Sequence, residues 1–382
     1  MKYLIGLLIL GMCFPVAACS LDNPSGGEPQ LTETGPITFG GPGDDDGVAV
    51  VPAGDGGWYV VANTLSFGAG ETDIWLVKTD STFTMEWERT FGTEGDDRAW
   101  NAIPDGNGGI LIGGFVGGYA SETGDIVFIQ VDAEGETGWY RTYDLPGRQA
   151  RGYVQQVGDD GYVLSGWSHA PGELADYLLI RTDATGEMLW HRTFGGDGQN
   201  GANSVRVTDD GGFAIFGEGL WSGGDDYEIW QGILVRTDSS GNLLWRREYG
   251  LSGAEEAYSL ALAHDGGFLA GGFSASDGTR GGYCVKCSPQ GTQIWWRRFN
   301  IPMVAFQIVP VTGGYLVVGP GGLCKLDEQG DSLWAQRCSE ISGINGLAVK
   351  PDGSIVIIGV TAGASSDRDV ALLLTDDEGN PL

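Results

Sequence analysis

Apolar and polar residues follow one pattern that recurs about every fifty residues between positions 37 and 382. Each unit opens with an aromatic or β-branched segment after a glycine turn, as at Phe213. A nearly continuous apolar run such as 177–180 follows, which is typical of a strand covered on both faces. A Thr-Asp-x-x-Gly turn then leads to a segment in which Trp190, Arg192 and Phe194 share one face, because side chains alternate along a strand. The pattern predicts a repeated unit of four antiparallel strands.

The unit is repeated seven times. Five copies of the Trp-x-Arg-x-aromatic segment are spaced by 50 to 55 residues, at Trp87, Trp139, Trp190, Trp245 and Trp295. A sixth, degraded copy follows at Trp334 after a shorter interval, which predicts shorter loops in that unit. A period of this length, made of short strands and glycine turns, is typical of units that bury their faces against their neighbours around an axis. The sequence therefore predicts an all-β fold, a seven-bladed β-propeller of four-stranded antiparallel blades.

The seventh copy, 344–382, has only three strand signals. The segment 35–41, Gly-Pro-Ile-Thr-Phe-Gly-Gly, matches the end of the fourth strands, as in Arg192 to Gly196, and precedes the first copy without a blade of its own. We predict that Ile37 to Phe39 completes the last blade, so that the ring closes without an open sheet edge. The propeller would then span residues 37–382.

The N-terminus predicts export. Met1 and Lys2 precede a short apolar stretch and then Val16-Ala17-Ala18-Cys19, which resembles a bacterial lipobox. By this resemblance, residues 1–18 are a signal peptide, Cys19 carries the lipid, and residues 19–36, rich in Pro, Gly and Ser, form a flexible tether. Cys13 is the rival lipidation site, and an ordinary secretory signal is the alternative. The expected location is the cell envelope, with a lipid anchor in the membrane, at the outer membrane or cell surface.

The charge balance argues against nucleic acid as a partner. The whole chain has a formal net charge of −30, with 51 acidic and 21 basic residues. Nucleic-acid binding requires a basic patch, whereas the arginines here are distributed singly through the repeats. The simplest interpretation of the acidity is an exported surface kept soluble by its own charge.

Cysteine and histidine spacing indicates no metal centre. Cys284, Cys287, Cys324 and Cys338 all fall in the fifth and sixth repeats, where they predict one or two disulfides or buried thiols. Cys284 and Cys287 have CxxC spacing, but no second pair of soft ligands matches it. The three histidines, His169, His191 and His264, fall on a predicted loop, strand and turn, so they imply no metal or proton-transfer cluster. No nucleophile elbow, P-loop or HExxH motif occurs, and no catalytic residue is assigned.

The remaining candidate chemistry is acidic. In a propeller, the loops from the fourth to the first strand and from the second to the third share one face. We refer to their carboxylates as the acidic rim; its predicted members are Asp44, Asp45, Asp46, Asp73, Asp96, Asp97, Asp176, Asp225 and Asp226. Such carboxylates can bind calcium or a basic partner, or can act as the acid and base of a glycosidase. The alternative is that they serve solubility and Asx turns. The opposite face is acidic too, through Asp80, Asp132, Asp183, Asp238 and Asp327.

The Asp-x-x-Gly-x-x-x-Trp element, as in Asp183 to Trp190, resembles a shortened tryptophan-docking motif of quinoprotein dehydrogenases and of the BamB-type outer-membrane assembly lipoprotein. It also resembles the sialidase Asp-box, with different spacing. Residues 37–382 as a whole look most like exported bacterial and archaeal propellers with Asp-Gly-Gly-Tyr repeats. Quinoproteins imply a pyrroloquinoline cofactor and a vicinal disulfide, but this chain has no adjacent cysteines, so no cofactor is expected and calcium is the only ion that the pattern permits.

Two functional hypotheses follow. The first is a lipid-anchored, non-catalytic propeller that serves as a binding or assembly platform for a protein or a glycan. The alternative is a carbohydrate-active enzyme in which two rim carboxylates act as acid and base, about 5 Å or about 6.5 to 9.5 Å apart.

Overall fold

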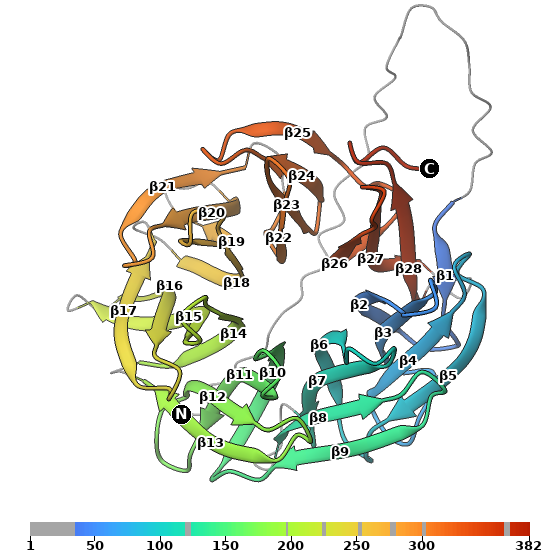
Figure 1. Ribbon diagram of the computed structural model, residues 1–382, viewed down its shortest axis with the longest axis horizontal. Coiled ribbons are helices and arrows are strands. Elements are labelled where there is room, and N and C mark those ends of the chain that lie inside the picture. The colour runs from blue at the N-terminus through green and yellow to red at the C-terminus, as the bar shows by residue number, and fades with distance from the viewer. Residues whose placement is uncertain are drawn as a thin grey trace, which may run out of the picture. The chain divides into compact units, whose positions relative to one another are not determined.

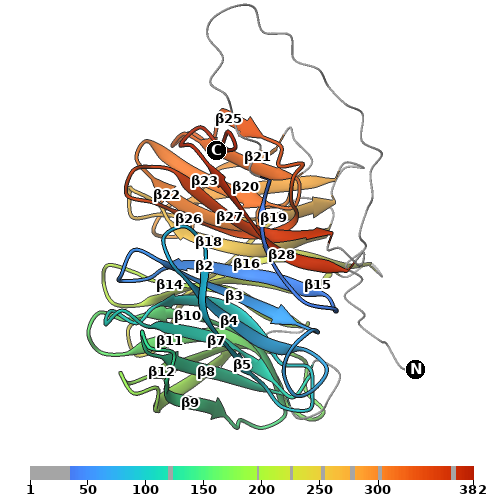
Figure 2. The same ribbon diagram turned by 90° about the vertical axis from the view of Figure 1, so that its right-hand side faces the viewer.

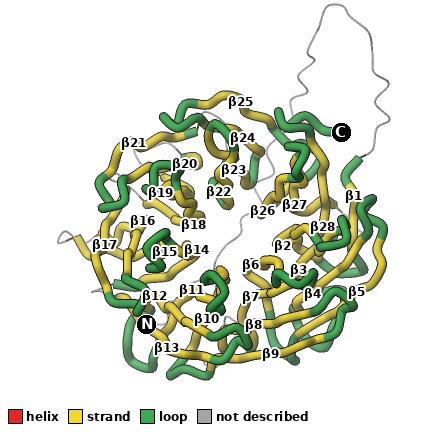
Figure 3. Tube along the Cα trace, in the orientation of Figure 1, coloured by secondary structure: helices red, strands yellow, loops and turns green. Residues whose placement is uncertain are grey.

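The computed structural model describes residues 35–118, 124–195, 198–223, 227–250, 254–275, 280–299, 303–362 and 367–382, with the side chains of 220–223, 227–229 and 362 excepted. The predicted signal peptide, Cys19 and residues 19–34 of the tether lie outside this part, as do Asp225 and Asp226 of the acidic rim. Strands and loops make up all of the described chain, and it contains no helix of the length and hydrophobicity that crossing a membrane requires (Figure 3).

Seven four-stranded antiparallel sheets surround one axis, which confirms the predicted fold class (Figure 1). Blades one to four comprise β2 (Asp45–Pro52), β3 (Trp58–Thr64), β4 (Asp73–Thr79) and β5 (Met85–Phe91); β6 (Arg98–Pro104), β7 (Ile110–Val116), β8 (Asp125–Val131) and β9 (Thr137–Tyr143); β10 (Arg148–Gln156), β11 (Tyr162–His169), β12 (Asp176–Thr182) and β13 (Met188–Phe194); β14 (Asn200–Val207), β15 (Phe213–Gly223), β16 (Tyr227–Thr237) and β17 (Leu243–Tyr249).

Blades five to seven comprise β18 (Ala254–Leu262), β19 (Phe268–Ala275), β20 (Gly281–Cys287) and β21 (Gln293–Arg298); β22 (Gln307–Val311), β23 (Gly314–Gly319), β24 (Gly322–Leu326) and β25 (Ser332–Gln336); β26 (Ser342–Val349), β27 (Ile355–Ala362), β28 (Arg368–Thr375) and β1 (Ile37–Phe39). The first strand of each blade lies innermost, and in the side view the strands run between the two faces of the ring (Figure 2).

The ring closes as the sequence predicted. Strand β1 pairs with β28, with Ile37 opposite Leu372 and Phe39 opposite Val370. The chain end supplies the beginning of the same outer strand, because Pro381 bridges Thr375 just as Met188 pairs with Thr182 in blade three. Counting along the two strands from these pairs, Leu382 takes the place of Leu189, and Gly35 takes the place of Trp190. The outer strand of blade seven is therefore assembled from both ends of the propeller.

The blades are held together by apolar faces. The third strand of each blade is buried on both sides, and every residue of β4 and β20 is buried. A cluster that includes Val51, Ile74 and Ile112, for example, joins blade one to blade two. Because the side chains of a central sheet strand point alternately to the two neighbouring blades, these strands have to be apolar at successive positions, which is the run seen in the sequence.

The repeated tryptophan docks on the next blade. In the turn between the third and fourth strands, a glycine with positive φ lies against the indole of the preceding blade. At Gly186, whose φ is +76°, a Cβ would lie 2.9 Å from the ring of Trp139, so this position requires glycine both for its backbone and for its close approach. An arginine two residues after five of these tryptophans lies over the indole, as Arg192 does over Trp190 at 5.2 Å, whereas Trp334 is followed by Gln336. The six pairs are Trp87 with Gly135, Trp139 with Gly186, Trp190 with Gly241, Trp245 with Gly291, Trp295 with Gly330, and Trp334 with Gly379.

The junction between blades seven and one departs from this rule. Blade seven has Gly35 where a tryptophan would stand, and blade one has Phe83 where the other turns have glycine. Phe83 keeps the left-handed backbone, with φ of 63°, and its buried ring stacks on Trp58 at 5.6 Å. The Phe83 ring belongs to the apolar cluster between the two blades, together with Phe39 and Ile358. A side chain of the receiving blade therefore supplies an aromatic ring at the one junction where the donor tryptophan is missing.

Candidate functional site

The most deeply buried rim carboxylates act as loop anchors. Asp45, at the start of β2, is fully buried and accepts hydrogen bonds from the Gly41 amide at 2.8 Å, from the Ser66 hydroxyl at 2.7 Å and from the Thr64 hydroxyl. Asp97 is also fully buried and accepts from the backbone amides of Thr93 and Gly117. Because these oxygens are turned into their own loops, they are not presented to a ligand.

Other blades fill the same position with uncharged residues or with glutamate. The equivalents of Asp45 and Asp97 are Gln149, Asn200 and Glu255, all buried. Gln149 donates its amide to the carbonyls of Leu145 and Gly147, and Asn200 donates to the carbonyl of Gly198. What the repeat requires here is a buried polar group that holds the incoming loop, and not a negative charge.

A second set of carboxylates starts the third strands. Asp73 is buried and accepts the amides of Ala69 and Gly70. The structure brings it next to Asp97, since a Cβ on Gly92 would lie 1.8 Å from Asp73 Oδ1 and 2.8 Å from Asp97 Oδ2. Burial raises the pKa of Asp176, the equivalent residue of blade three, and the nearby Glu173 carboxylate raises it further.

The more exposed rim carboxylates are ion-paired. Asp44 and Asp46 both contact the guanidinium of Arg368, at 2.9 and 3.0 Å, and Asp96 contacts Arg98 at 2.8 Å. Hydrogen bonds from Arg368 lower the pKa of Asp44, whereas burial raises the pKa of Asp46 despite the same arginine. The predicted rim residues thus fall into separate anchors and ion pairs around the ring. Within the described residues, no group of three or more His, Cys, Asp or Glu side chains is arranged to hold a metal ion.

The carboxylates of the opposite face form Asx turns. Asp183 Oδ1, for example, accepts the amides of Thr185 and Glu187. Asp80, Asp132, Asp238, Asp327 and Asp376 make the same two contacts, and Ser288 Oγ replaces the carboxylate in blade five. Turn formation, which the sequence analysis gave as the alternative role of the rim carboxylates, is therefore the role of the carboxylates on this face.

The four blade cysteines are free thiols in this structure. Cys284, Cys287 and Cys324 are buried and Cys338 is half-buried. Burial raises the pKa of Cys287 to about 11 and that of Cys324 to about 12, so both remain protonated near neutral pH. The sequence left disulfides and buried thiols open, and the structure contains thiols. Cys284, Cys287 and Cys324 pack in the apolar clusters between blades four, five and six.

A ring of polar side chains joins the blades near the axis. At each of the seven junctions, a side chain of one blade bonds the backbone of the innermost strand of the next. The seven contacts are Asn63 to Ala99, Asn101 to Val154, Arg151 to Ala202, Asn203 to Ala257, Ser259 to Ile308, Gln307 to Leu347, and Asn345 to Gly47. Most members are short and neutral. Arg151 is the exception, and it marks the candidate site.

Arg151 occupies a position where four of the other innermost strands have Gly47, Ala99, Ala202 and Ala257. Each of these residues directly precedes a β-bulge, and so does Arg151. Its φ is 85°, in the left-handed region that non-glycine residues avoid. Phe83 is the only other described non-glycine residue in this region. Backbone strain held by the surrounding fold is a feature of functional positions.

This arginine contacts Trp100 of blade two and Glu218 of blade four, and Asn203 connects Glu218 to the backbone of blade five. We call Trp100, Arg151, Asn203, Glu218, Glu256 and Tyr258 the inner-strand cluster. The Arg151 guanidinium contacts Glu218 Oε1 at 2.7 Å and lies 5.4 Å from the Trp100 ring centre. Asn203 donates its amide to the other oxygen of Glu218. The side chains of Arg151 and Glu218 are only 12% and 15% exposed. Because water has little access to the two charges, each depends on the other for its stabilisation.

Tyr258 provides the aromatic side of the cluster. Its hydroxyl donates to the exposed Glu256 carboxylate, and its ring meets that of Phe306 edge-on at 4.7 Å. Burial raises the pKa of Tyr258 well above its usual value, and the charges of Glu256 and Glu218 raise it further. The phenol therefore stays a hydrogen-bond donor. Half-buried aromatic rings beside a fixed arginine and two carboxylates are suited to binding a polar partner.

This cluster was not predicted from the sequence. A signal was present, since Arg151 and Glu218 differ from the small or uncharged residues at the same repeat positions. It was hidden because Arg151 and Glu218 lie 67 residues apart, in neighbouring blades, so that their contact is not visible in the spacing of either repeat.

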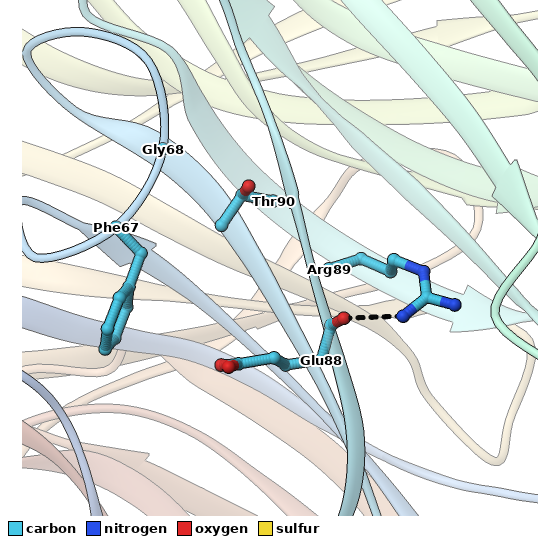
Figure 4. Close-up of a pocket in the computed structure, with 5 residues that line it drawn as sticks. All are labelled: Phe67, Gly68, Glu88, Arg89 and Thr90. Carbon is cyan, nitrogen blue, oxygen red and sulfur yellow. Dashed lines mark hydrogen bonds between the residues drawn. The ribbon is translucent and has the colours of Figure 1, made fainter.

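A groove on the outside of blade one has fewer groups available to a ligand than the inner-strand cluster has. Figure 4 shows it lined by Phe67, Gly68, Glu88, Arg89 and Thr90, with a volume of about 390 Å³. Phe67 packs on Trp75 at 4.9 Å, and Glu88 accepts the indole N–H of Trp75 at 2.8 Å. Arg89 points away from Phe67 and donates to the Glu88 carbonyl (Figure 4). These contacts stabilise the blade and leave few groups directed at a ligand.

The sequence matches no family model and no curated protein. Solved structures share the fold. Polysaccharide lyase Uly1 is 9% identical with a TM-score of 0.57, over 85% of this chain and 90% of the lyase. The WD40 domain of Neurospora crassa Pan2 is 10% identical with a TM-score of 0.55, over 89% of this chain and 94% of that domain.

The S511A mutant of puromycin hydrolase is 16% identical with a TM-score of 0.57. The match covers 88% of this chain but about half, 53%, of the hydrolase. At these identities the comparisons show a shared β-propeller and no shared activity, because one fold carries many unrelated functions.

Proposed function

We propose that this protein is a lipid-anchored, non-catalytic propeller of the cell envelope that presents the inner-strand cluster to a protein or glycan partner. The observation that carries the proposal is the contrast between the two sets of polar residues. The buried rim carboxylates Asp45, Asp73 and Asp97 are bonded to their own loops. Arg151 and Glu218 of the cluster, in contrast, depart from the repeat, and Arg151 is held in a left-handed backbone conformation. Trp100, Glu256 and Tyr258 are the members with exposed surface available to a partner.

Binding is tested with a variant that the fold itself suggests. Blade one carries Gly47 and Asn63 at the positions of Arg151 and Glu218. The double change Arg151→Gly and Glu218→Asn removes both charges of the ion pair, so that no buried charge is left without a partner. Glycine also tolerates the positive φ at position 151. We expect an unfolding midpoint close to that of the original protein and at least a tenfold loss of affinity for the partner.

The measurement is an array of glycans and a cross-linking pull-down from envelope extract, each run on the original protein and the double variant. Arg141→Gln and Glu187→Gln, which remove an ion pair between the outer strand of blade two and a turn of blade three, serve as the matched control. A partner that binds both proteins equally would contradict the proposed site.

The alternative function is a carbohydrate-active enzyme. One observation is a reason to test it. Glu218 and Glu256 both lie close enough to Tyr258 to raise its pKa, which places two carboxylates near one phenol. A hydrolysis assay on the same glycans therefore accompanies the binding assay. Hydrolysis that disappears in Glu256→Gln but persists in Asp46→Asn would overturn the non-catalytic proposal.

The anchor is tested separately. If Cys19 carries the lipid, Cys19→Ala should move the protein from the membrane fraction to the soluble fraction, because the rest of the exported chain is strongly acidic and has no second anchor in the proposal. Cys13→Ala is the control and should leave the protein in the membrane fraction. Retention of the Cys19 variant in membranes would exclude this anchor without affecting the binding site.

A further inference from the structure

A pocket of about 510 Å³ lies between blades five and six, on the face opposite the acidic rim. His264 and Asp265 come from the turn after β18, Lys286 from β20, Ile294 and Trp295 from β21, and Glu328 from the turn after β24. The pocket shares no residue with the inner-strand cluster. Any role it has is therefore separate from the proposed function above.

Part of this arrangement belongs to the repeat. Lys286 contacts Asp265 at 3.1 Å, as Lys78 contacts Asp55 in blade one and Arg236 contacts Asp210 in blade four. This pair ties the first turn of a blade to its third strand. In blade one, Lys78 also contacts Glu86 of the same blade at 2.8 Å, whereas the second partner of Lys286 comes from the next blade.

His264 and Glu328 are additions to the repeat. The equivalents of His264 include Gly54, Asp209 and Pro351, and the equivalents of Glu328 include Ala133 and Ala184. Both residues are unnecessary for the turn, since the turns without them have the same hydrogen bonds. At this one junction, however, the histidine and the glutamate meet across two blades.

Glu328 fixes the orientation of the histidine. Its carboxylate contacts His264 Nδ1, Lys286 Nζ at 3.0 Å and the Tyr315 hydroxyl at 2.8 Å. Burial alone would raise the pKa of Glu328, but the hydrogen bonds from these three donors lower it to about 2. An ionised carboxylate only accepts hydrogen bonds, so the Nδ1 of His264 that faces it carries a proton, and Nε2 is the ring nitrogen on the side away from Glu328.

The rest of the pocket combines an apolar floor with polar walls. Ile294 is 55% exposed, and Trp295 is held in place by its indole N–H, which donates to the Glu328 carbonyl at 3.2 Å. Asp265 and Gln329 add acceptors and an amide at the edge. The Lys286 ammonium is matched by two carboxylates, which disfavours an anionic ligand.

We propose that this pocket binds a neutral saccharide unit. One sugar hydroxyl forms a hydrogen bond with His264 Nε2, and the C–H face of the sugar ring lies on Ile294 and the edge of Trp295. Sugar rings carry both donors and acceptors around an apolar face, which is the combination that the pocket presents.

The chain has three histidines, so the imidazole signals in nitrogen-15 NMR spectra are readily assigned with a His264→Ala variant. We titrate the purified full chain with the tetrasaccharides of glucose, mannose, galactose and xylose, in α and β linkages. The expected result is a saturable shift of the His264 signals with at least one sugar, while the signals of His169 and His191 stay unchanged.

Ile294→Asp tests the floor of the pocket, and Leu333→Asp is its control. Both residues precede the tryptophan of an outer strand and both are 55% exposed, but only Ile294 lines the pocket. We expect at least a tenfold loss of affinity for Ile294→Asp, and no change for Leu333→Asp or for the inner-strand double variant. The absence of a His264 shift with every sugar, or equal binding by Ile294→Asp, would overturn the proposal.

Discussion

Deletion of Ile37, Thr38 and Phe39 is expected to open the ring and to lower the free energy of unfolding by about 5 kcal/mol, from the loss of a buried aromatic side chain, a half-buried isoleucine and the ladder to β28. The exposed edge of β28 should also promote association between molecules, because an unpaired strand edge is a template for pairing. Urea unfolding and light scattering measure the two effects.

A rearranged chain separates the loss of the strand from the loss of the N-terminal sequence. Since Leu382 and Gly35 occupy successive positions of one outer strand, a chain that runs from Pro42 to Leu382 and continues directly into 35–41 should regain the stability to within about 1 kcal/mol. Deletion of Ser25, Gly26 and Gly27 is the control and should change nothing. An unchanged unfolding midpoint after deletion of β1 would show that closure does not depend on this strand.

Phe83→Gly is expected to lower the free energy of unfolding by about 2 kcal/mol. Removal of a buried phenylalanine ring costs about 3 to 5 kcal/mol, and release of a left-handed residue returns about 1 to 2 kcal/mol. The variant is expected to be less stable because the Phe83 ring stacks on Trp58 and fills the site that a tryptophan fills at the other junctions. Thermal and urea unfolding of the purified variant measure the difference.

The converse change is the matched control. Gly186→Phe, at the same turn position of blade three, places a side chain where Trp139 already lies and should cost about 4 kcal/mol or more. If Phe83→Gly proved more stable than the original protein, the backbone strain would outweigh the packing, and Phe83 would not act as a substitute for the missing tryptophan.

The propeller itself was predictable from the sequence. Glycine turns, buried third strands and the outer tryptophan report local geometry and burial, and their repetition reports the number of blades. The closing strand was predictable too, because Ile37 to Phe39 matches the end of a fourth strand but lies before the first repeat, where it has no blade of its own.

The chemistry was predicted less well. The acidic rim was identified from residue type, but type does not say where a carboxylate points, and Asp45 and Asp97 point into their own loops. Their equivalents Gln149 and Asn200 make similar bonds without a charge. The inner-strand cluster, in contrast, joins Trp100, Arg151 and Tyr258 from three blades, and no spacing along the chain brings them together.

The amino-acid sequence by itself determined the number of blades, their strand order and the seam at which the ring closes. Those properties depend on interactions within a blade or with the next one, which recur with the period of the chain. Only the tertiary structure decided which polar residues are anchors and which form candidate sites. Arg151 with Glu218, and His264 with Glu328, meet across blade junctions, and their contacts depend on a β-bulge and on turn positions that the register of neighbouring sheets brings together.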